Sequence, residues 1–334
     1  MNLQARIQAF TLLGEYLKAD IYQQAGEELN LAKVHNPWFT KENIDKSLSA
    51  WHEQLKLDML TAWLNPYKIK EVKNPKKVLI IMAGNIPLVG FHDFLTVLIL
   101  GHKVIVKMSS TDNLLLKVLI EKLISIASEF KESIAYIDDV KNRKFDAVIA
   151  TGSDNSAQYF EYYFKGAKKI IRKNRRSVAL LDGSESAMEL KGLADDVFAY
   201  FGLGCRNVSK LFLPKGYDLN KLFEAFFPYS HVVEHKKYGN NYDYNKAIFL
   251  MGSIKLVENG FLLMKEDKSL LSPVAMLYYE YYDDVEAVEQ FIEKNAEQLQ
   301  CVVSKKDIPF GNTQQPNLWD YADGVDTVDF LREL

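Results

Sequence analysis

Residues 78–110 read VLIIMAGNIPLVGFHDFLTVLILGHKVIVKMSS and carry the strongest structural signal of the chain. The first five residues form a short apolar run that is typical of a buried strand, and Gly84-Asn85-Ile86-Pro87 follows as a turn. The apolar segment from Phe91 to Leu100 has the length of a helix, and Gly101 closes it. Val104-Ile105-Val106 is then a second strand. This order predicts two parallel strands joined by a crossover helix.

The same stretch is apolar and long enough to cross a bilayer, but a membrane span is the wrong interpretation. His92 and Asp93 are ionisable, and the turn at Asn85 and Pro87 would break the helix. Placing such groups in lipid is costly. The sequence therefore predicts no membrane span.

Strands and helices continue to alternate beyond this stretch. We expect strands at residues 134–137, 146–150, 169–171, 177–181, 210–213, 246–251 and 274–282. Helices are expected at residues 112–130, 156–164, 188–200, 219–227 and 285–297. The alternation predicts an α/β fold with parallel sheets.

The first seventy residues have a helical pattern instead. Ile44, Leu48, Trp51 and Leu55 recur at spacings of three and four residues after a predicted cap at Thr40. We therefore expect an N-terminal helical layer.

The composition is that of an ordinary globular protein. Of 334 residues, 48% are hydrophobic and 25% are charged, which is enough chain for about two domains. The net charge of −3 gives no global positive field, so we expect no nucleic-acid partner. Cys205 and Cys301 are the two cysteines, too few for a disulfide scaffold or a cysteine-rich zinc module. The first residues lack the layout of a signal peptide, and we expect a cytoplasmic protein.

Three turns would lie at the carboxyl ends of predicted parallel strands, where open sheets bind ligands. They are residues 83–87, residues 107–110 and Thr151-Gly152-Ser153. The G-x-G-x-x-G fingerprint is absent after the first strand, so a standard Rossmann site is not predicted. Thr151-Gly152-Ser153 places hydroxyls and a glycine at a helix N-terminus, where backbone N–H groups favour a phosphate. The alternative for this turn is a helix cap.

Lys107 and Asn85 each have a functional and a structural interpretation. Lys107 ends a strand, where its ammonium group could reach a ribose or a phosphate, or could simply be solvated. Asn85 could direct its amide into the crevice as a hydrogen-bond donor, or could be an ordinary turn residue.

Cys205 is the candidate nucleophile. It follows Gly202 and Gly204, which allow the backbone to approach a ligand closely, and Arg206 is a cationic neighbour that favours a thiolate. The structural alternative is a small buried apolar residue after a helix. Cys301 lies in an apolar strand, and we expect it in the core.

Two charged motifs also require interpretation. His231-Val232-Val233-Glu234-His235 fits a zinc-binding H-x-x-E-H pattern, but Pro228 and the β-branched pair disfavour the α-helix that the pattern needs. We expect no metal site there. Residues 172–176 read RKNRR, which is either a solvated face or a site for an anionic cofactor tail.

In their order along the chain, these turns resemble the motifs of the aldehyde dehydrogenase superfamily, most closely its LuxC-type branch, the bacterial fatty acyl-CoA reductases. The resemblance runs from about residue 76 to the C-terminus. It rests on Ala83-Gly84-Asn85-Ile86-Pro87-Leu88, Gly101 to Ser110, Thr151-Gly152-Ser153, Phe201-Gly202-Leu203-Gly204-Cys205, Ser272-Pro273-Val274 and Trp319 to Thr327.

The resemblance implies an aldehyde dehydrogenase-like fold, with a non-standard Rossmann cofactor domain and an α/β catalytic domain. We expect the N-terminal helical layer over residues 1–70, the nicotinamide-cofactor domain over 71–182, the catalytic domain over 183–305 and a C-terminal tail over 306–334 that packs on the body. Homo-oligomers are common in the superfamily, and the resemblance extends that option to this chain.

The resemblance also implies roles for single residues. Cys205 would be the nucleophile, and Asn85 with the Cys205 backbone N–H would form the oxyanion hole. Lys107, Ser109, Ser110 and the turn of Thr151, Gly152 and Ser153 would belong to the cofactor site.

Departures from the superfamily pattern refine the expected reaction. Aldehyde-oxidising members have a glutamate base in an E-L-G-G stretch, but the corresponding residues 170–174 are basic here, and Ser269 stands where a second glutamate is expected. Without the base, water is poorly activated, which favours exchange with coenzyme A over hydrolysis. Ser110 replaces an acidic residue and would not repel a 2′-phosphate, which favours NADPH over NADH.

The sequence thus predicts an NADPH-dependent acyl-CoA reductase that makes an aldehyde from a long-chain acyl-CoA. The nearest alternative is an NAD(P)-dependent aldehyde dehydrogenase that releases a carboxylic acid. A metallopeptidase built on the histidine motif and a non-catalytic nucleotide-binding protein are the remaining alternatives.

Overall fold

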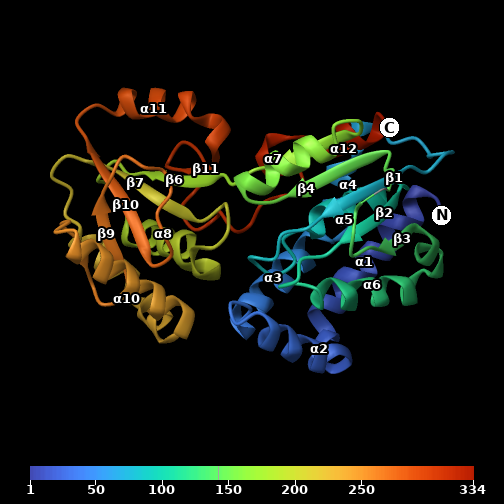
Figure 1. The fold of residues 1–334 in the computed structure, drawn as a ribbon, viewed down its shortest axis with the longest axis horizontal. Helices are drawn as coiled ribbons and strands as arrows, with labels where there is room; N and C mark the ends of the chain where they lie inside the picture. Colours follow the sequence, from blue (N-terminus) through green and yellow to red (C-terminus); the bar gives the residue numbers. More distant parts are fainter. Residues whose placement is uncertain (142) are drawn as a thin grey trace. The chain divides into compact units, whose positions relative to one another are not determined.

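The computed structural model describes residues 1–141 and 143–334, which form two compact units. The first unit comprises Met1–Asn174 and Asn317–Leu334, and the second comprises Arg175–Pro316. Each unit contains one sheet flanked by helices (Figure 1). The four-part division expected from the sequence stays a prediction.

The sheet of the first unit has five parallel strands in the order β3-β2-β1-β4-β5. The strands are β1 (Lys77–Ile81), β2 (Lys103–Lys107), β3 (Ile134–Tyr136), β4 (Ala147–Thr151) and β5 (Lys168–Arg172). All five were predicted from the sequence. Because the strands are parallel, the turns after β1, β2 and β4 all lie at the same edge of the sheet.

Helices surround this sheet. Before β1 come α1 (Leu3–Ala19), α2 (Ile21–His35), α3 (Lys41–Gln54), α4 (Leu57–Leu64) and the 3₁₀-helix η1 (Asn65–Tyr67). Between the strands lie α5 (Phe91–Ile99), α6 (Leu115–Ile126), η2 (Ser128–Ser133) and α7 (Asp154–Tyr163). Thr40 caps α3 as predicted, because its side chain accepts a hydrogen bond from the Asn43 N–H.

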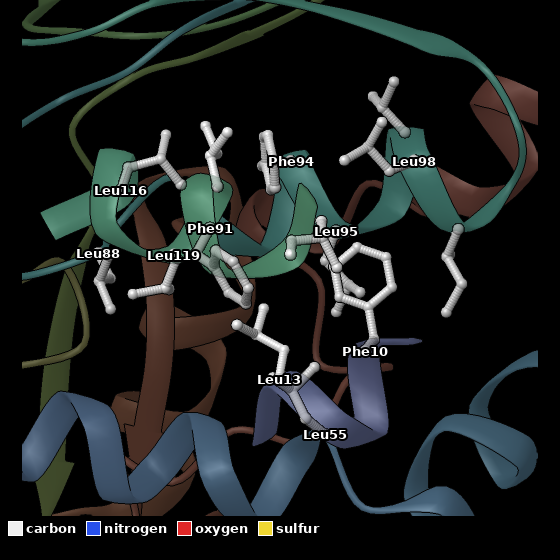
Figure 2. Close-up of a cluster of buried hydrophobic side chains, with 14 of the residues drawn as sticks. Phe10, Leu13, Leu55, Leu88, Phe91, Phe94, Leu95, Leu98, Leu116 and Leu119 are labelled. Carbon is white, nitrogen blue, oxygen red and sulfur yellow. The ribbon is translucent and has the colours of Figure 1, made fainter. Parts of the chain in front are cut away.

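The N-terminal helices share one hydrophobic core with the sheet. Figure 2 shows Phe10 and Leu13 of α1 and the nearby Leu55 facing the side chains of α5 and α6. Phe10, Leu13 and Leu55 are fully buried, as is Phe94 of α5. Burying a side chain of this size contributes about 1.5–3 kcal/mol, so the helices of residues 3–64 are integral to the first unit.

The C-terminal segment returns to the first unit through polar contacts. It contains η6 (Ala322–Gly324) and α12 (Thr327–Arg332). Trp63 Nε1 donates to the Tyr321 hydroxyl at 2.8 Å, the Tyr321 and Tyr67 hydroxyls are 2.7 Å apart, and Tyr67 donates to Asp326 at 2.7 Å. Since the Tyr67 proton is committed to Asp326, the Tyr321 hydroxyl donates to Tyr67. This chain of donors attaches the tail to α4 and η1.

The second unit has a six-stranded sheet in the order β11-β6-β7-β10-β9-β8. Its strands are β6 (Arg176–Leu180), β7 (Val208–Pro214), β8 (Val257–Glu258), β9 (Leu263–Glu266), β10 (Met276–Tyr282) and β11 (Leu299–Val303). Its helices are α8 (Ala187–Phe198), η3 (Ala199–Gly202), α9 (Asn220–Phe226), η4 (Phe227–Glu234), α10 (Lys236–Met251), α11 (Val285–Lys294) and η5 (Ala296–Gln298). The β8–β9 pair is antiparallel and the other pairs are parallel.

Two predicted elements differ from the structure. The strand predicted at residues 246–251 is wrong, because these residues are the last turns of α10. The buried positions Tyr238, Tyr242 and Asn245 recur at helical spacing, so the period is set by residues before the apolar run. The helix predicted from residue 112 begins at Leu115, since Ser109 and Asp112 form an antiparallel bridge.

None of the helices that the structure describes has both the length and the apolar composition needed to cross a bilayer. Residues 78–101 form a strand, a turn and a nine-residue helix.

Candidate active site

The turn that bears Asn85 follows β1 at the carboxyl edge of the first sheet. Asn85 itself is exposed, whereas Pro87 and Leu88 behind it are buried. The turn lies directly against residues 109–111, because a Cβ added to Gly84 would be 2.5 Å from the hydroxyl oxygens of Ser109 and Thr111. Gly84 is therefore required for close packing of the Asn85 turn on the segment that follows β2.

A pocket of about 580 Å³ opens at the ends of β2 and β3 in the first unit. Lys107, Ser109 and Ser110 line it together. Its other lining residues are Met82, Val106, Met108, Asn113, Lys117, Tyr136, Ile137 and Asp138. The structure thus brings three of the predicted cofactor residues together in one pocket. Asn113 and Lys117 extend that set, and neither was singled out in the sequence.

The turn of Thr151, Gly152 and Ser153 lies at the end of β4, on the other side of β1 from β2. Ser153 is the N-cap of α7, and its side chain accepts a hydrogen bond from the Ser156 N–H. Gly152 is packed tightly, because an added Cβ would be 2.8 Å from the Ser156 Cβ. Ser153 is therefore a helix cap, which was the structural alternative for this turn. Strand β1 lies between its strand β4 and the strand β2 that ends at Lys107.

Cys205 belongs to the second unit and is half-buried. It follows three successive residues with left-handed backbone, Tyr200 at φ 52°, Phe201 at φ 58° and Gly202 at φ 74°. Left-handed conformation costs about 1–2 kcal/mol for a residue with a side chain. Strain of this kind is concentrated at functional sites, where the surrounding structure enforces it.

Two side chains hold the Cys205 turn. The Asn207 carbonyl oxygen accepts a hydrogen bond from the Gly204 N–H at 2.8 Å, while its amide donates to the carbonyl oxygens of Asp196 and Ala199. Ser177 Oγ donates to the Cys205 carbonyl oxygen at 2.9 Å. Asn207 is 3% exposed, so all its hydrogen bonds are made in the interior and fix the turn to the end of α8.

Arg206, predicted as a cationic neighbour of Cys205, has one guanidinium nitrogen 3.3 Å from the Cys301 sulfur. Cys301 is buried in β11, as predicted. In the part of the chain that the structure describes, neither cysteine forms a disulfide.

Arg172 in the basic run at residues 172–176 has a structural role, which corrects the suggestion of an anionic cofactor tail for this residue. Its two terminal nitrogens donate to Asp93 of α5 at 2.5 and 2.8 Å, and one of them also donates to Thr327 at 3.1 Å. Arg172 and Asp93 are both buried. Sequence reasoning missed this pair because the partners are 79 positions apart.

The histidine motif lies in a 3₁₀-helix. Residues Phe227–Glu234 form η4, and His235 follows as its C-cap. Among residues 1–141 and 143–334, no group of three or more histidine, cysteine or acidic side chains is arranged to hold a metal ion.

Similarity to known proteins defines the fold class. The structure resembles an aldehyde dehydrogenase from Mycobacterium tuberculosis in complex with NAD⁺, with a TM-score of 0.67 and 13% identity over 94% of this chain and 75% of that one. It also resembles an NADP-dependent glyceraldehyde-3-phosphate dehydrogenase from Bacillus halodurans (TM-score 0.64, 11% identity, 91% and 74% coverage). An acetylating aldehyde dehydrogenase from Geobacillus thermoglucosidasius matches with a TM-score of 0.61 and 13% identity over 89% of this chain and 75% of that one. The fold is that of the aldehyde dehydrogenases, as predicted.

The family follows from the sequence match. The model of the LuxC acyl-CoA reductase family matches residues 13–225. The chain therefore belongs to the LuxC acyl-CoA reductase family and is an oxidoreductase that acts on aldehyde or acyl groups. No protein of curated function matches the sequence.

Proposed function

We propose that the protein reduces a long-chain acyl-CoA to the aldehyde with NADPH, through a thioester on Cys205. The observation that carries the proposal is the Cys205 turn of this LuxC-family chain. A half-buried thiol follows a strained left-handed run, and Asn207 and Ser177 fix the backbone on both sides of it. A strained and anchored backbone around a cysteine fits a nucleophile better than a residue that only fills space.

The pocket at Lys107 supports binding of a nicotinamide cofactor. Its volume of about 580 Å³ is typical of small-molecule sites. Lys107 and Lys117 offer ammonium groups to a phosphate, while Ser109, Ser110 and Asn113 offer hydrogen bonds to a sugar. When bound, the cofactor supplies a hydride. The similar Bacillus halodurans enzyme forms a complex with NADP.

NADPH is the proposed form because of the charges around this pocket. Ser110 carries no negative charge that would repel a 2′-phosphate, and Lys117 adds a second cation to Lys107. Asp138 lines the same pocket on the β3 side, so the lysines leave a net positive charge of one.

The chemistry begins at the sulfur of Cys205. The Cys205 thiolate forms a bond to the acyl carbon of acyl-CoA, the carbon–sulfur bond to coenzyme A breaks, and coenzyme A leaves and takes up a proton. The role that we assign to the Asn85 amide, and separately to the Cys205 N–H, is to donate a hydrogen bond to the oxyanion that forms in between. The Cys205 thioester then accepts a hydride at its carbonyl carbon, and the thiohemiacetal collapses to aldehyde and Cys205 thiolate.

The missing base supports reduction over hydrolysis. In the stretch where oxidising relatives have a glutamate, Arg172 is buried against Asp93 and the neighbouring Lys173 is exposed. Neither side chain is a carboxylate base, so this stretch does not supply the group that activates water against the acyl-enzyme.

Consumption of NADPH with a series of acyl-CoAs, with the product identified, tests the function. We expect aldehyde formation that the Cys205→Ser variant loses, while Cys301→Ser, the matched control at the other cysteine, retains it. Oxidation of an aldehyde to a carboxylic acid without coenzyme A, and no reduction of any acyl-CoA, would establish the dehydrogenase alternative instead. The chain-length series also tests the long-chain assignment.

A further inference from the structure

The turn that bears Asn85 is fastened at its first residue by two side chains. The Gly84 carbonyl oxygen accepts hydrogen bonds from the Asn36 amide at 3.2 Å and from the Thr111 hydroxyl at 3.0 Å. Asn36 is the C-cap of α2 and is 5% exposed. The Thr111 hydroxyl also pairs with the Ser109 hydroxyl at 2.9 Å. Since Ser109 lines the pocket at Lys107, this pocket and the Asn85 turn share one wall.

The last residues of the turn are fastened as well. Ser47 of α3 donates to the Pro87 carbonyl oxygen at 2.9 Å, and the Leu88 N–H donates to Asp112 Oδ2 at 3.1 Å. Leu88 has φ 58°, a conformation that a leucine adopts rarely. The bond to Asp112 therefore holds a backbone that would otherwise relax, and Asn85 lies between the two fastened ends.

Burial shows that the two anchors from the N-terminal helices, Asn36 and Ser47, are built into the core, whereas Thr111 is exposed. Ser47 is 4% exposed, so an unmade hydrogen bond there would leave a polar group without water. Its helix α3 leads into Leu55, which packs in the core that Figure 2 shows. The N-terminal helices thus transmit the rigidity of this core to the Asn85 turn.

We propose that Ser47 and Asp112 are positioning residues for Asn85, so that the N-terminal helices and the segment after β2 together fix the backbone that carries its amide. The inference rests on the proposed function, because it assumes that Asn85 stabilises the oxyanion. It assigns to the helices of residues 3–64 a part in catalysis that they exert through the Asn85 backbone.

The energetics of Asp112 support a positioning role. Burial raises the pKa of Asp112 to about 6, and the Leu88 N–H lowers it. Asp112 Oδ1 is buried and accepts no hydrogen bond from the residues that the structure describes. A buried carboxylate with one oxygen unsatisfied destabilises the fold at neutral pH. The hydrogen bond from the Leu88 N–H to the other oxygen offsets part of this cost.

Transition-state stabilisation is sensitive to this geometry. Removal of one oxyanion-hole donor costs about 100-fold or more in rate, and a displacement of about 1 Å can cost about 100-fold. We expect Ser47→Ala to slow acyl-enzyme formation about tenfold at saturating acyl-CoA, with KM changed less than twofold. Asp112→Ala should act in the same direction, while Ser47→Thr and Asp112→Asn keep the hydrogen bond and recover most of the rate.

The decisive experiment is a double-mutant cycle with Asn85→Ala, measured as the single-turnover rate of acyl-enzyme formation. If Ser47 acts through Asn85, Ser47→Ala slows the wild-type background about tenfold and the Asn85→Ala background less than twofold. Asn43→Ala is the matched control on the same helix. Asn43 is buried and donates to the Trp38 carbonyl oxygen at 3.0 Å, away from the turn.

Each outcome has a separate meaning. Equal effects of Ser47→Ala in both backgrounds, or an effect equal to that of Asn43→Ala, would overturn the inference and leave the proposed function standing. A wild-type protein that reduces no acyl-CoA would overturn the proposed function and the inference with it. Hydrogen exchange supplies a second measurement: faster exchange of residues 84–88 in Ser47→Ala, and not in Asn43→Ala, supports the anchoring, and unchanged exchange contradicts it.

Discussion

The guanidinium group of Arg172 and the carboxylate of Asp93 form a two-pronged ion pair in the interior of the first unit, at 2.5 and 2.8 Å. Arg172 ends β5 and Asp93 lies in the first turn of α5, so the pair joins an outer strand of the sheet to the helix that follows β1. Arg172 also donates a hydrogen bond to Thr327, the first residue of α12, so the same guanidinium group contacts the C-terminal helix. Arg172, whose basic stretch was interpreted in the sequence as a possible site for an anionic cofactor tail, thus stabilises the packing of the first unit.

Asp93→Asn should destabilise the protein strongly, because it leaves a buried guanidinium without its counter-charge. Breaking a buried pair from one side typically costs about 3–5 kcal/mol. Urea unfolding at pH 7 measures the loss. Asp45→Asn, at the exposed ion pair with Lys41, is the control and should change the free energy of unfolding by less than about 1 kcal/mol. A similar small change for Asp93→Asn would contradict a structural role for the pair.

Lys117→Ala should weaken the binding of NADPH more than the binding of NADH. If Lys117 contacts the 2′-phosphate, its loss should raise KM for NADPH about tenfold, equivalent to about 1.4 kcal/mol, and change KM for NADH little. Lys122→Ala is the control on the same helix, since Lys122 donates to Gln24 rather than lining the pocket. Steady-state kinetics with both cofactors give the result. A parallel rise for NADPH and NADH would mean that Lys117 contacts a part common to both.

Features that depend on residues close together in the sequence were predicted, whereas contacts between residues far apart in the sequence were not. All five strands of the first sheet follow from local apolar runs such as residues 78–82, and the capping of α3 by Thr40 follows from residue type. Lys117 was not found because it appears in the sequence as one polar position of an amphipathic helix. The signal that could have identified it is a second lysine in the helix that follows the strand ending at Lys107.

The anchors of the Asn85 turn were beyond reach for a different reason. Ser47 is 40 positions from Pro87 and Asn36 is 48 positions from Gly84, and polar residues in amphipathic helices are normally solvent-facing. Only the packing of α2 and α3 against the sheet unit makes these side chains face inward. In the same way, the helix period of α10 is set before the apolar residues 246–251, and a window restricted to them predicted a strand.

His102 should make the protein less stable as the pH falls. Its Nδ1 accepts from the Lys76 N–H and its Nε2–H donates to the Leu331 carbonyl oxygen, which requires the neutral ring. Burial lowers the pKa of His102 below its usual value of about 6.5. The stabilisation is therefore complete above pH 6.5 and is lost as the pH falls through the lower folded-state pKa.

Urea unfolding between pH 5 and pH 8 measures this effect. His102→Gln should lose about 1–3 kcal/mol at pH 8, where the neutral histidine makes both bonds, and less at pH 5. His35→Gln, at an exposed position, is the control for the replacement of a histidine by glutamine. A constant difference between His102→Gln and the wild type across this range would show that the titration of His102 does not contribute.

Asp112 should have the opposite effect, because it should make the wild-type protein less stable as the pH rises, and Asp112→Asn tests this. Burial raises the pKa of Asp112 from an unfolded value near 3.8 to about 6 in the folded protein, so folding favours the protonated acid. Its contribution to stability is complete below pH 3.8 and is lost as the pH rises through about 6. A shift of about two pKa units corresponds to about 3 kcal/mol at most. Asparagine keeps an acceptor for the Leu88 N–H without the charge, so the variant should gain stability over the wild type at pH 8 and lose that advantage near pH 4.

The same variant separates stability from catalysis. If the bond to Leu88 positions Asn85, Asp112→Asn retains acyl-enzyme formation and is more stable, whereas Asp112→Ala loses the bond and slows the reaction. Unfolding at several pH values and single-turnover kinetics on both variants give the comparison. A loss of rate in Asp112→Asn equal to that in Asp112→Ala would mean that the carboxylate charge, rather than the hydrogen bond to Leu88, is what the reaction requires.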